Sequence, residues 1–175
     1  ILIKMLNVTF LRHAKSEWGN FDGDDLNRDI SEIGIEKTKK IGSFLRNEKI
    51  VFDEVLCSPS LRTKKTLAIV SVFFLNKPKV RYIKDLYYTS GKNLFDILML
   101  NAQKKRCLIV SHEPLLSSSI ELFFNDYNNK DFLRAIEKFS TSSLFNASFK
   151  CDNWYEICAD IAKINFFKKP KDLNL

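Results

Sequence analysis

The chain has 175 residues, 45% of them hydrophobic and 28% charged, with a formal net charge of +7. This length predicts one domain with a substantial core, and the composition is that of a globular protein rather than a disordered or fibrous one. The longest apolar stretch, residues 68–75, is too short to span a bilayer.

Strand-like and helix-like segments alternate along the sequence. In chain order we expect a strand over residues 7–13, a polar loop over 16–29, a helix begun by Ser31, strand 53–57, helix 61–75, strand 79–83, helix 93–101, strand 107–111, helix 115–124, a short helix around 132–138, and strands 143–149, 154–158 and 161–167. This alternation predicts an α/β fold: a single three-layer α/β/α domain with a mostly parallel sheet, an antiparallel edge and helices on both faces.

The domain is assigned to residues 5–175, and residues 1–4 are set apart as an upstream extension or a cloning remnant. No secretory signal pattern is visible over residues 1–11. Four cysteines occur without Cys-x-x-Cys spacing, namely Cys57, Cys107, Cys151 and Cys158. Such spacing favours reduced thiols in a cytoplasmic protein. Two distant histidines without a thiol pair make a poor zinc ligand set, so we expect no metal.

The only two histidines each end a short apolar run. His13 follows residues 7–12, and His112 follows residues 106–111. Such runs are typical of buried parallel strands, and ligands bind outside the carboxyl ends of these strands. A lone histidine is more often structural, but two histidines at one sheet edge with arginines nearby indicate an active site.

Arginines accompany the first histidine and the second strand. Arg12 adjoins His13, where its charge keeps the imidazole neutral and its guanidinium can contact a phosphate through two donors. Ser16 and free backbone amides follow in the loop. Arg62 falls in the first turn of the helix after Ser58-Pro59, where the amides favour anions. The alternative for Arg62 is a surface ion pair.

Two acidic segments are interpreted without a catalytic role. Glu113, next to His112, is a carboxylate favoured at a helix N-terminus. The run Asp22–Asp25 lacks EF-hand spacing and is interpreted as a solvated turn. The positive net charge includes a cluster over residues 167–171, but no nucleic-acid motif is visible. We therefore expect an anionic ligand, with neither nucleic acid nor membrane as a partner, and the oligomeric state stays open.

Three ordered blocks resemble the histidine phosphatase superfamily, which includes phosphoglycerate mutases and small phosphohistidine phosphatases. They are Leu-Arg-His-Ala-Lys-Ser at residues 11–16, Ser-Pro-x-x-Arg-x-x-x-Thr at 58–66 and Val-Ser-His at 110–112. Residues 27–34 are similar to the family segment Asp-Arg-Pro-Leu-x-x-x-Gly, which makes Arg28 a further candidate phosphate ligand. The likeness is greatest to the short SixA-like branch, through residues 11–18 and 167–172.

The resemblance implies a mechanism without a cofactor or metal. His13 would attack phosphorus and become transiently phosphorylated, and water would then hydrolyse the phosphohistidine. The phosphoryl oxygens would be held by a cage of positive and polar groups, namely Arg12, Arg28, Arg62, His112 and Ser16.

The chain departs from the family at the proton donor. Larger members place a glutamate after the third strand, whereas the corresponding stretch here, residues 84–88, has a tyrosine in that position. Glu17 and Asp85 remain candidate donors. Loss of general acid catalysis costs roughly a hundred- to ten-thousandfold for a poor leaving group, but an imidazole needs little help.

The sequence therefore predicts a cytoplasmic, metal-independent phosphatase acting through a phosphohistidine intermediate on His13, with phosphorylated protein histidine as the preferred substrate. Two alternatives stay open. One is a phosphatase of small phosphate esters, and the other is a non-catalytic module that binds phosphorylated ligands on the same fold.

Overall fold

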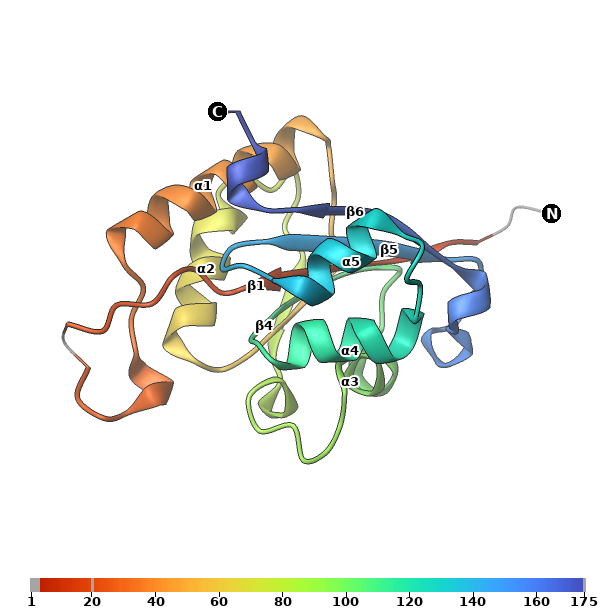
Figure 1. Ribbon diagram of the computed structural model, residues 1–175, viewed down its shortest axis with the longest axis horizontal. Helices are drawn as coiled ribbons and strands as arrows, with labels where there is room; N and C mark the ends of the chain where they lie inside the picture. The colour runs from red at the N-terminus through yellow and green to blue at the C-terminus, as the bar shows by residue number, and fades with distance from the viewer. Residues whose placement is uncertain (1–3, 20, 175) are drawn as a thin grey trace.

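A six-stranded sheet forms the centre of the computed structural model, which describes residues 4–19 and 21–174 (Figure 1). The strand order is β3-β2-β4-β1-β5-β6, and the strands are β1 (Leu6–Arg12), β2 (Glu54–Cys57), β3 (Lys79–Tyr82), β4 (Arg106–Ser111), β5 (Leu144–Phe149) and β6 (Ala162–Lys168). Strands β1 to β4 are mutually parallel, and β5 is antiparallel to both neighbours. The predicted parallel sheet with an antiparallel edge is confirmed.

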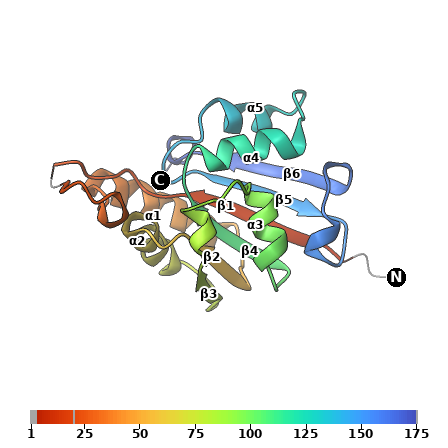
Figure 2. The ribbon, with the colours of Figure 1, turned by 90° about the horizontal axis from the view of Figure 1, so that it is seen from below.

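Helices cover both faces of the sheet (Figure 2). They are α1 (Glu32–Asn47) and α2 (Leu61–Ser71) on one face, and α3 (Leu94–Asn101), α4 (Leu115–Phe124) and α5 (Lys130–Glu137) on the other. Each face has its own apolar cluster, because side chains alternate along the strands. In β1, Val8 and Phe10 pack toward α3, α4 and α5, while Leu11 packs toward α1 and α2. The predicted three-layer domain is therefore confirmed.

One predicted strand is wrong. Residues 154–158 do not join the sheet, and Trp154–Glu156 form a short 3-10 helix instead. The Trp154 indole nitrogen donates to the Lys104 carbonyl oxygen at 2.7 Å, and the ring packs against Phe149. A large apolar side chain that is buried outside the sheet therefore gives the segment the sequence pattern of a strand. The helix predicted over residues 61–75 also ends earlier, at Ser71.

The structure bears on two further expectations, the burial of cysteines in strands and the lack of a segment long enough to span a bilayer. Cys57 and Cys107 are buried in strands as predicted, and Cys151 and Cys158 are free thiols nearer the surface. No helix in residues 4–19 and 21–174 has the length and apolar character needed to cross a membrane. Of the segment set apart at residues 1–4, the first three residues lie outside the described part of the chain.

The segment that follows β1 is fixed by the start of α1. Ser31 caps this helix as predicted, since its hydroxyl accepts from the Gly34 amide at 3.0 Å. The Lys15 carbonyl oxygen accepts from both the amide and the hydroxyl of Ser31, at 2.8 and 3.1 Å. Gly34 allows this approach, because a Cβ added there would lie 2.6 Å from the Lys15 oxygen.

Gly34→Ala tests this close packing. The helix gains at most about 1 kcal/mol from replacing glycine, whereas forced overpacking against backbone costs about 1–3 kcal/mol. We therefore expect a net loss of stability on urea unfolding. Gly19→Ala is the matched control, because its new methyl group meets only Glu17 Oε1, at 3.4 Å, and should change stability by less than about 0.5 kcal/mol. Equal stability of the two variants would contradict the packing account.

Candidate active site

The two histidines lie side by side because β1 and β4 are parallel neighbours. In their register Arg12 is opposite Ser111, so His13 and His112 both follow the ends of their strands. The His13 amide donates to the Ser111 carbonyl oxygen at 3.1 Å, and the two ring centroids are 5.2 Å apart. The sequence expectation that the histidines share one sheet edge is correct.

His13 is a neutral imidazole with one nitrogen available. Its Nδ1 lies 2.7 Å from the Ala14 carbonyl oxygen, which can only accept, so Nδ1 carries the proton and Nε2 keeps its lone pair. Burial, together with the charges of Arg62, Arg12 and Arg28, lowers the pKa of His13 to about 3 against the opposing effect of the bond to Ala14. A neutral ring with a free lone pair is the form that attacks phosphorus.

His112 is held by the second block of the sequence. Its Nε2 lies 2.6 Å from the Ser58 hydroxyl, while Nδ1 has no partner within the described residues. Burial, followed by the nearby rings and charges of His13 and Arg62, lowers the pKa of His112 to about 3. If Ser58 donates to Nε2, the neutral ring carries its proton on Nδ1 and can donate to an anion.

Thr66, the last residue of the block at 58–66, has a structural role. Its hydroxyl oxygen accepts from the Ala14 amide at 2.8 Å and donates to the Arg62 carbonyl oxygen at 2.6 Å. The side chain thus ties helix α2 to the backbone immediately after His13. Thr66 positions the histidine segment and does not itself face the cavity.

The guanidinium groups of half-buried Arg12 and buried Arg62 have only some of their donors hydrogen-bonded. Arg12 donates through Nη1 to the Phe139 carbonyl oxygen at 2.8 Å. Arg62, 5% exposed, donates through Nη1 and Nη2 to the carbonyl and carboxylate oxygens of Asp25, at 2.7 and 3.0 Å. The Nε atoms of both arginines have no partner among the described residues.

These orphaned atoms belong to a local group. Within the described part of the chain, every buried side-chain nitrogen or oxygen that lacks a partner, apart from Arg81 Nε, lies in the segments that carry or contact the two histidines: Arg12 Nε, Arg62 Nε, His112 Nδ1, Ser16 Oγ and Ser143 Oγ. Buried polar atoms without partners are rare in folded proteins. A gathering of cationic and polar donors is complementary to an anion with several oxygens.

Arg28 is placed differently from the other predicted phosphate ligands. Its guanidinium stacks 4.0 Å from the Trp18 ring centre, and its Nε and Nη2 both donate to Asp25 Oδ1, at 3.2 and 3.0 Å. Arg28 therefore reaches Arg62 through the shared carboxylate of Asp25. Its charge acts on His13 at a distance, as one of the groups that lower its pKa.

The two candidate proton donors lie apart from the cavity beside His112. The Glu17 carboxylate accepts from the amides of Trp18 and Gly19, at 2.9 and 3.0 Å, and so closes its own loop. Asp85 forms an ion pair with Lys92 at 3.2 Å. Neither side chain lines the cavity, so the structure does not bring them to the wall beside His112.

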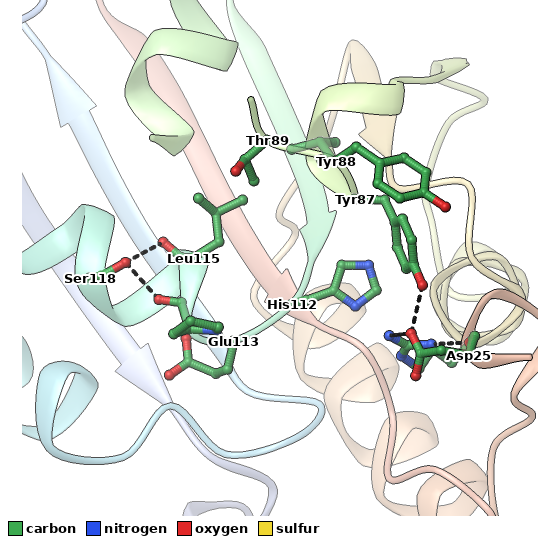
Figure 3. A pocket seen from close by; sticks show the side chains of 11 residues that line it. Asp25, Tyr87, Tyr88, Thr89, His112, Glu113, Leu115 and Ser118 are labelled. Atoms are coloured by element: carbon green, nitrogen blue, oxygen red, sulfur yellow. Dashed lines mark hydrogen bonds and ion pairs between the residues drawn. The ribbon is translucent and has the colours of Figure 1, made fainter. Parts of the chain in front are cut away.

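An open cavity of about 570 Å³ adjoins His112 (Figure 3). Its wall includes Arg62, Asp25, Tyr87, Tyr88 and Glu113. Glu113 serves the start of α4, as expected from the sequence, because its carboxylate accepts from the Ser117 amide and hydroxyl at 2.7 and 2.6 Å. No group of three or more His, Cys, Asp or Glu side chains within residues 4–19 and 21–174 could hold a metal ion.

Asp25 and Tyr87 are the site residues that sequence reasoning missed. The interpretation of residues 22–25 as a solvated turn is wrong for Asp25, whose carboxylate accepts from Arg28, Arg62 and the Tyr87 hydroxyl, the last at 2.7 Å. Burial raises the pKa of Asp25, but the hydrogen bonds and charges of Tyr87 and Arg62 outweigh it and bring the pKa to about 2. The available signal for Tyr87 was its place in residues 84–88, the stretch that corresponds to the family glutamate and contains two tyrosines.

Comparison with known proteins agrees with this arrangement. The sequence model of the histidine phosphatase superfamily (branch 1) matches residues 8–81, which contain Arg12, His13, Arg28 and Arg62. Over these residues the chain is similar to the histidine phosphatase superfamily. The uncharacterized protein ML1117 of Mycobacterium leprae is 27% identical over 166 residues, covering 92% of this chain and all of the relative.

Solved histidine phosphatase structures show the same fold. A SixA protein from Agrobacterium tumefaciens, assigned as a phosphohistidine phosphatase, aligns with a TM-score of 0.74 and 21% identity over 94% of this chain and 98% of its own. The protein histidine phosphatase SixA in complex with tungstate aligns with a TM-score of 0.69 and 18% identity, over 97% of this chain and all of its own. The superfamily contains phosphatases and mutases, and this chain has their fold.

The titration of the two imidazoles can be measured directly, because the chain has no other histidine. Since both folded-state pKa values are lowered to about 3, the ring signals in an NMR titration should stay in the neutral form from pH 8 down to pH 4.5. Stability should fall as pH drops from about 6.5 toward 3, because the unfolded chain then binds the protons that the folded chain excludes. A midpoint near 6.5 for either ring would contradict the burial account.

Proposed function

We propose that this protein is a metal-independent phosphatase that works through a phosphohistidine intermediate on His13 and removes phosphate from protein histidine. The observation that carries the proposal is the neutral His13 ring, with its Nε2 free, beside orphaned donors of Arg12, Arg62 and His112. A nucleophile and an anion cage at one sheet edge are the two parts that phosphoryl transfer requires.

The first half of the reaction needs no proton transfer to His13. The lone pair on Nε2 forms a bond to phosphorus as the bond to the leaving group breaks, and the ring keeps its Nδ1 proton, which is hydrogen-bonded to the Ala14 carbonyl oxygen. The growing positive charge of the ring is balanced by the bound phosphoryl oxygens, which Arg12, Arg62 and His112 Nδ1 would hold. In the second half, water attacks phosphorus and the bond between phosphorus and His13 Nε2 breaks, with its electron pair returning to Nε2. Both protons of the water stay on the phosphate product.

The preference for phosphohistidine rests on the lack of an available acid. Asp25 is ionised at neutral pH, since its pKa is about 2, and the Glu113 carboxylate is engaged by Ser117. An alkoxide leaves poorly without a proton, whereas a neutral imidazole is a good leaving group. The open cavity beside His112 also suits a side chain presented on a protein surface.

The test compares wild type with His13→Ala on a phosphohistidine-containing protein, phosphoramidate and small phosphomonoesters, all in the presence of a chelator. We expect wild-type turnover to be fastest on the phosphorus–nitrogen substrates and to fall at least a thousandfold in the variant, because the nucleophile is lost. Circular dichroism shows whether the variant is folded.

The rival functions predict other results from the same assay. Faster turnover of small phosphomonoesters would favour the ester phosphatase. Tight vanadate binding with no turnover of any donor would favour the binding module. Full turnover by a folded His13→Ala variant would refute the nucleophile itself.

A further inference from the structure

The phenol of Tyr87 faces the cavity with its proton already engaged. Its hydroxyl donates to Asp25 Oδ2 at 2.7 Å, and its ring lies 5.6 Å from that of His112 (Figure 3). A hydroxyl has one proton and two acceptor lone pairs. With the proton directed at a carboxylate that can only accept, Tyr87 presents acceptor capacity to the cavity.

Asp25 fixes the orientation of the Tyr87 hydroxyl because the acceptor positions of its carboxylate are all in use. Its two oxygens accept four hydrogen bonds, two from Arg28 and one each from Arg62 and Tyr87. A carboxylate has about four lone-pair positions, so these donors saturate it. Asp25 therefore does not bind a leaving group itself, but it holds the Tyr87 hydroxyl and the Arg62 guanidinium in one arrangement.

We propose that Tyr87, oriented by Asp25, determines leaving-group specificity by accepting an N–H from the imidazole that departs from the substrate. The inference rests on the proposed function and extends it. A phosphoryl group held between His13 and His112 places its leaving group in the cavity lined by His112 and Tyr87. A phosphorylated imidazole protonated on its far ring nitrogen carries the N–H that this oxygen can accept.

The step balances without an acid. The His13 Nε2–P bond forms, and the bond between phosphorus and the substrate nitrogen breaks with its electron pair going to that nitrogen. The far nitrogen keeps its proton, so the product is neutral imidazole. The bond to Tyr87 favours the protonated substrate ring, which is the form that leaves readily.

The same arrangement disfavours Tyr87 as a general acid. Giving up the proton would put a phenolate beside the Asp25 carboxylate, and burial together with that carboxylate raises the pKa of Tyr87 to about 12. A substrate whose leaving group needs a proton therefore finds an acceptor where a donor is required. A tyrosine oriented in this way therefore favours a nitrogen leaving group over an oxygen leaving group.

The test measures kcat/KM of wild type and Tyr87→Phe on phosphoimidazole and on para-nitrophenyl phosphate, whose leaving group has no N–H. The ratio of the first to the second should fall about tenfold in the variant, the effect of losing one hydrogen bond. Asp25→Asn should lower the same ratio, because the amide no longer holds the hydroxyl proton as strongly. Tyr127→Phe is the matched control, since it also removes a tyrosine–carboxylate bond, to Glu121 at 3.0 Å, away from the cavity.

A second substrate makes the result specific to the N–H. Phosphoimidazole methylated on the far nitrogen has no proton there, so its kcat/KM relative to para-nitrophenyl phosphate should be the same in wild type and Tyr87→Phe. A ratio unchanged by Tyr87→Phe on phosphoimidazole, or lowered equally on the methylated substrate, would overturn the inference alone. Absence of wild-type turnover on every substrate would overturn the proposed function and the inference with it.

Discussion

The parallel pairing of β1 with β4 is the constraint on which the site depends. It places the only two histidines of the chain at the carboxyl ends of the two strands, with their ring centroids 5.2 Å apart. The same pairing buries both rings, and burial is the largest cause of their low pKa values. Neutrality of the proposed nucleophile is thus a consequence of the fold rather than of one neighbouring group.

Burying positive charge is costly, and Asp25 offsets that cost. Arg62 is nearly inaccessible and would be unfavourable without a partner. The Asp25 carboxylate neutralises it and joins it to Arg28, while Arg62 Nε has no partner among the described residues. One carboxylate therefore stabilises both arginines and leaves donors that can bind the oxygens of a substrate.

Most of the sheet could be predicted from the sequence because its central strands β1, β2, β4 and β5 are short, buried segments rich in apolar residues. The two histidines and Arg12 were located for the same reason: each stands at a fixed distance from such a run. The strand predicted over residues 154–158 is wrong because Trp154 is buried outside the sheet, where its indole is hydrogen-bonded to the Lys104 carbonyl oxygen.

The contacts of Asp25 could not be predicted in this way. They join the loop at residue 25 to Arg62 and Tyr87, which are 37 and 62 positions away in the sequence. A run of acidic residues around glycine is by default a solvated turn, and only the folded chain shows which carboxylate turns inward. The position of Arg28, stacked on Trp18 instead of facing the histidines, is equally a tertiary result.

The most direct test of a neutral His13 nucleophile is to trap the phosphorylated enzyme. Wild-type protein mixed with ³²P-labelled phosphoramidate and quenched within milliseconds should carry label that survives alkali and is lost in acid, as expected for a phosphohistidine. Peptide mass analysis should place that label on His13 alone. Label on Ser16 or His112, or rapid turnover with no labelled enzyme at any time, would contradict the account.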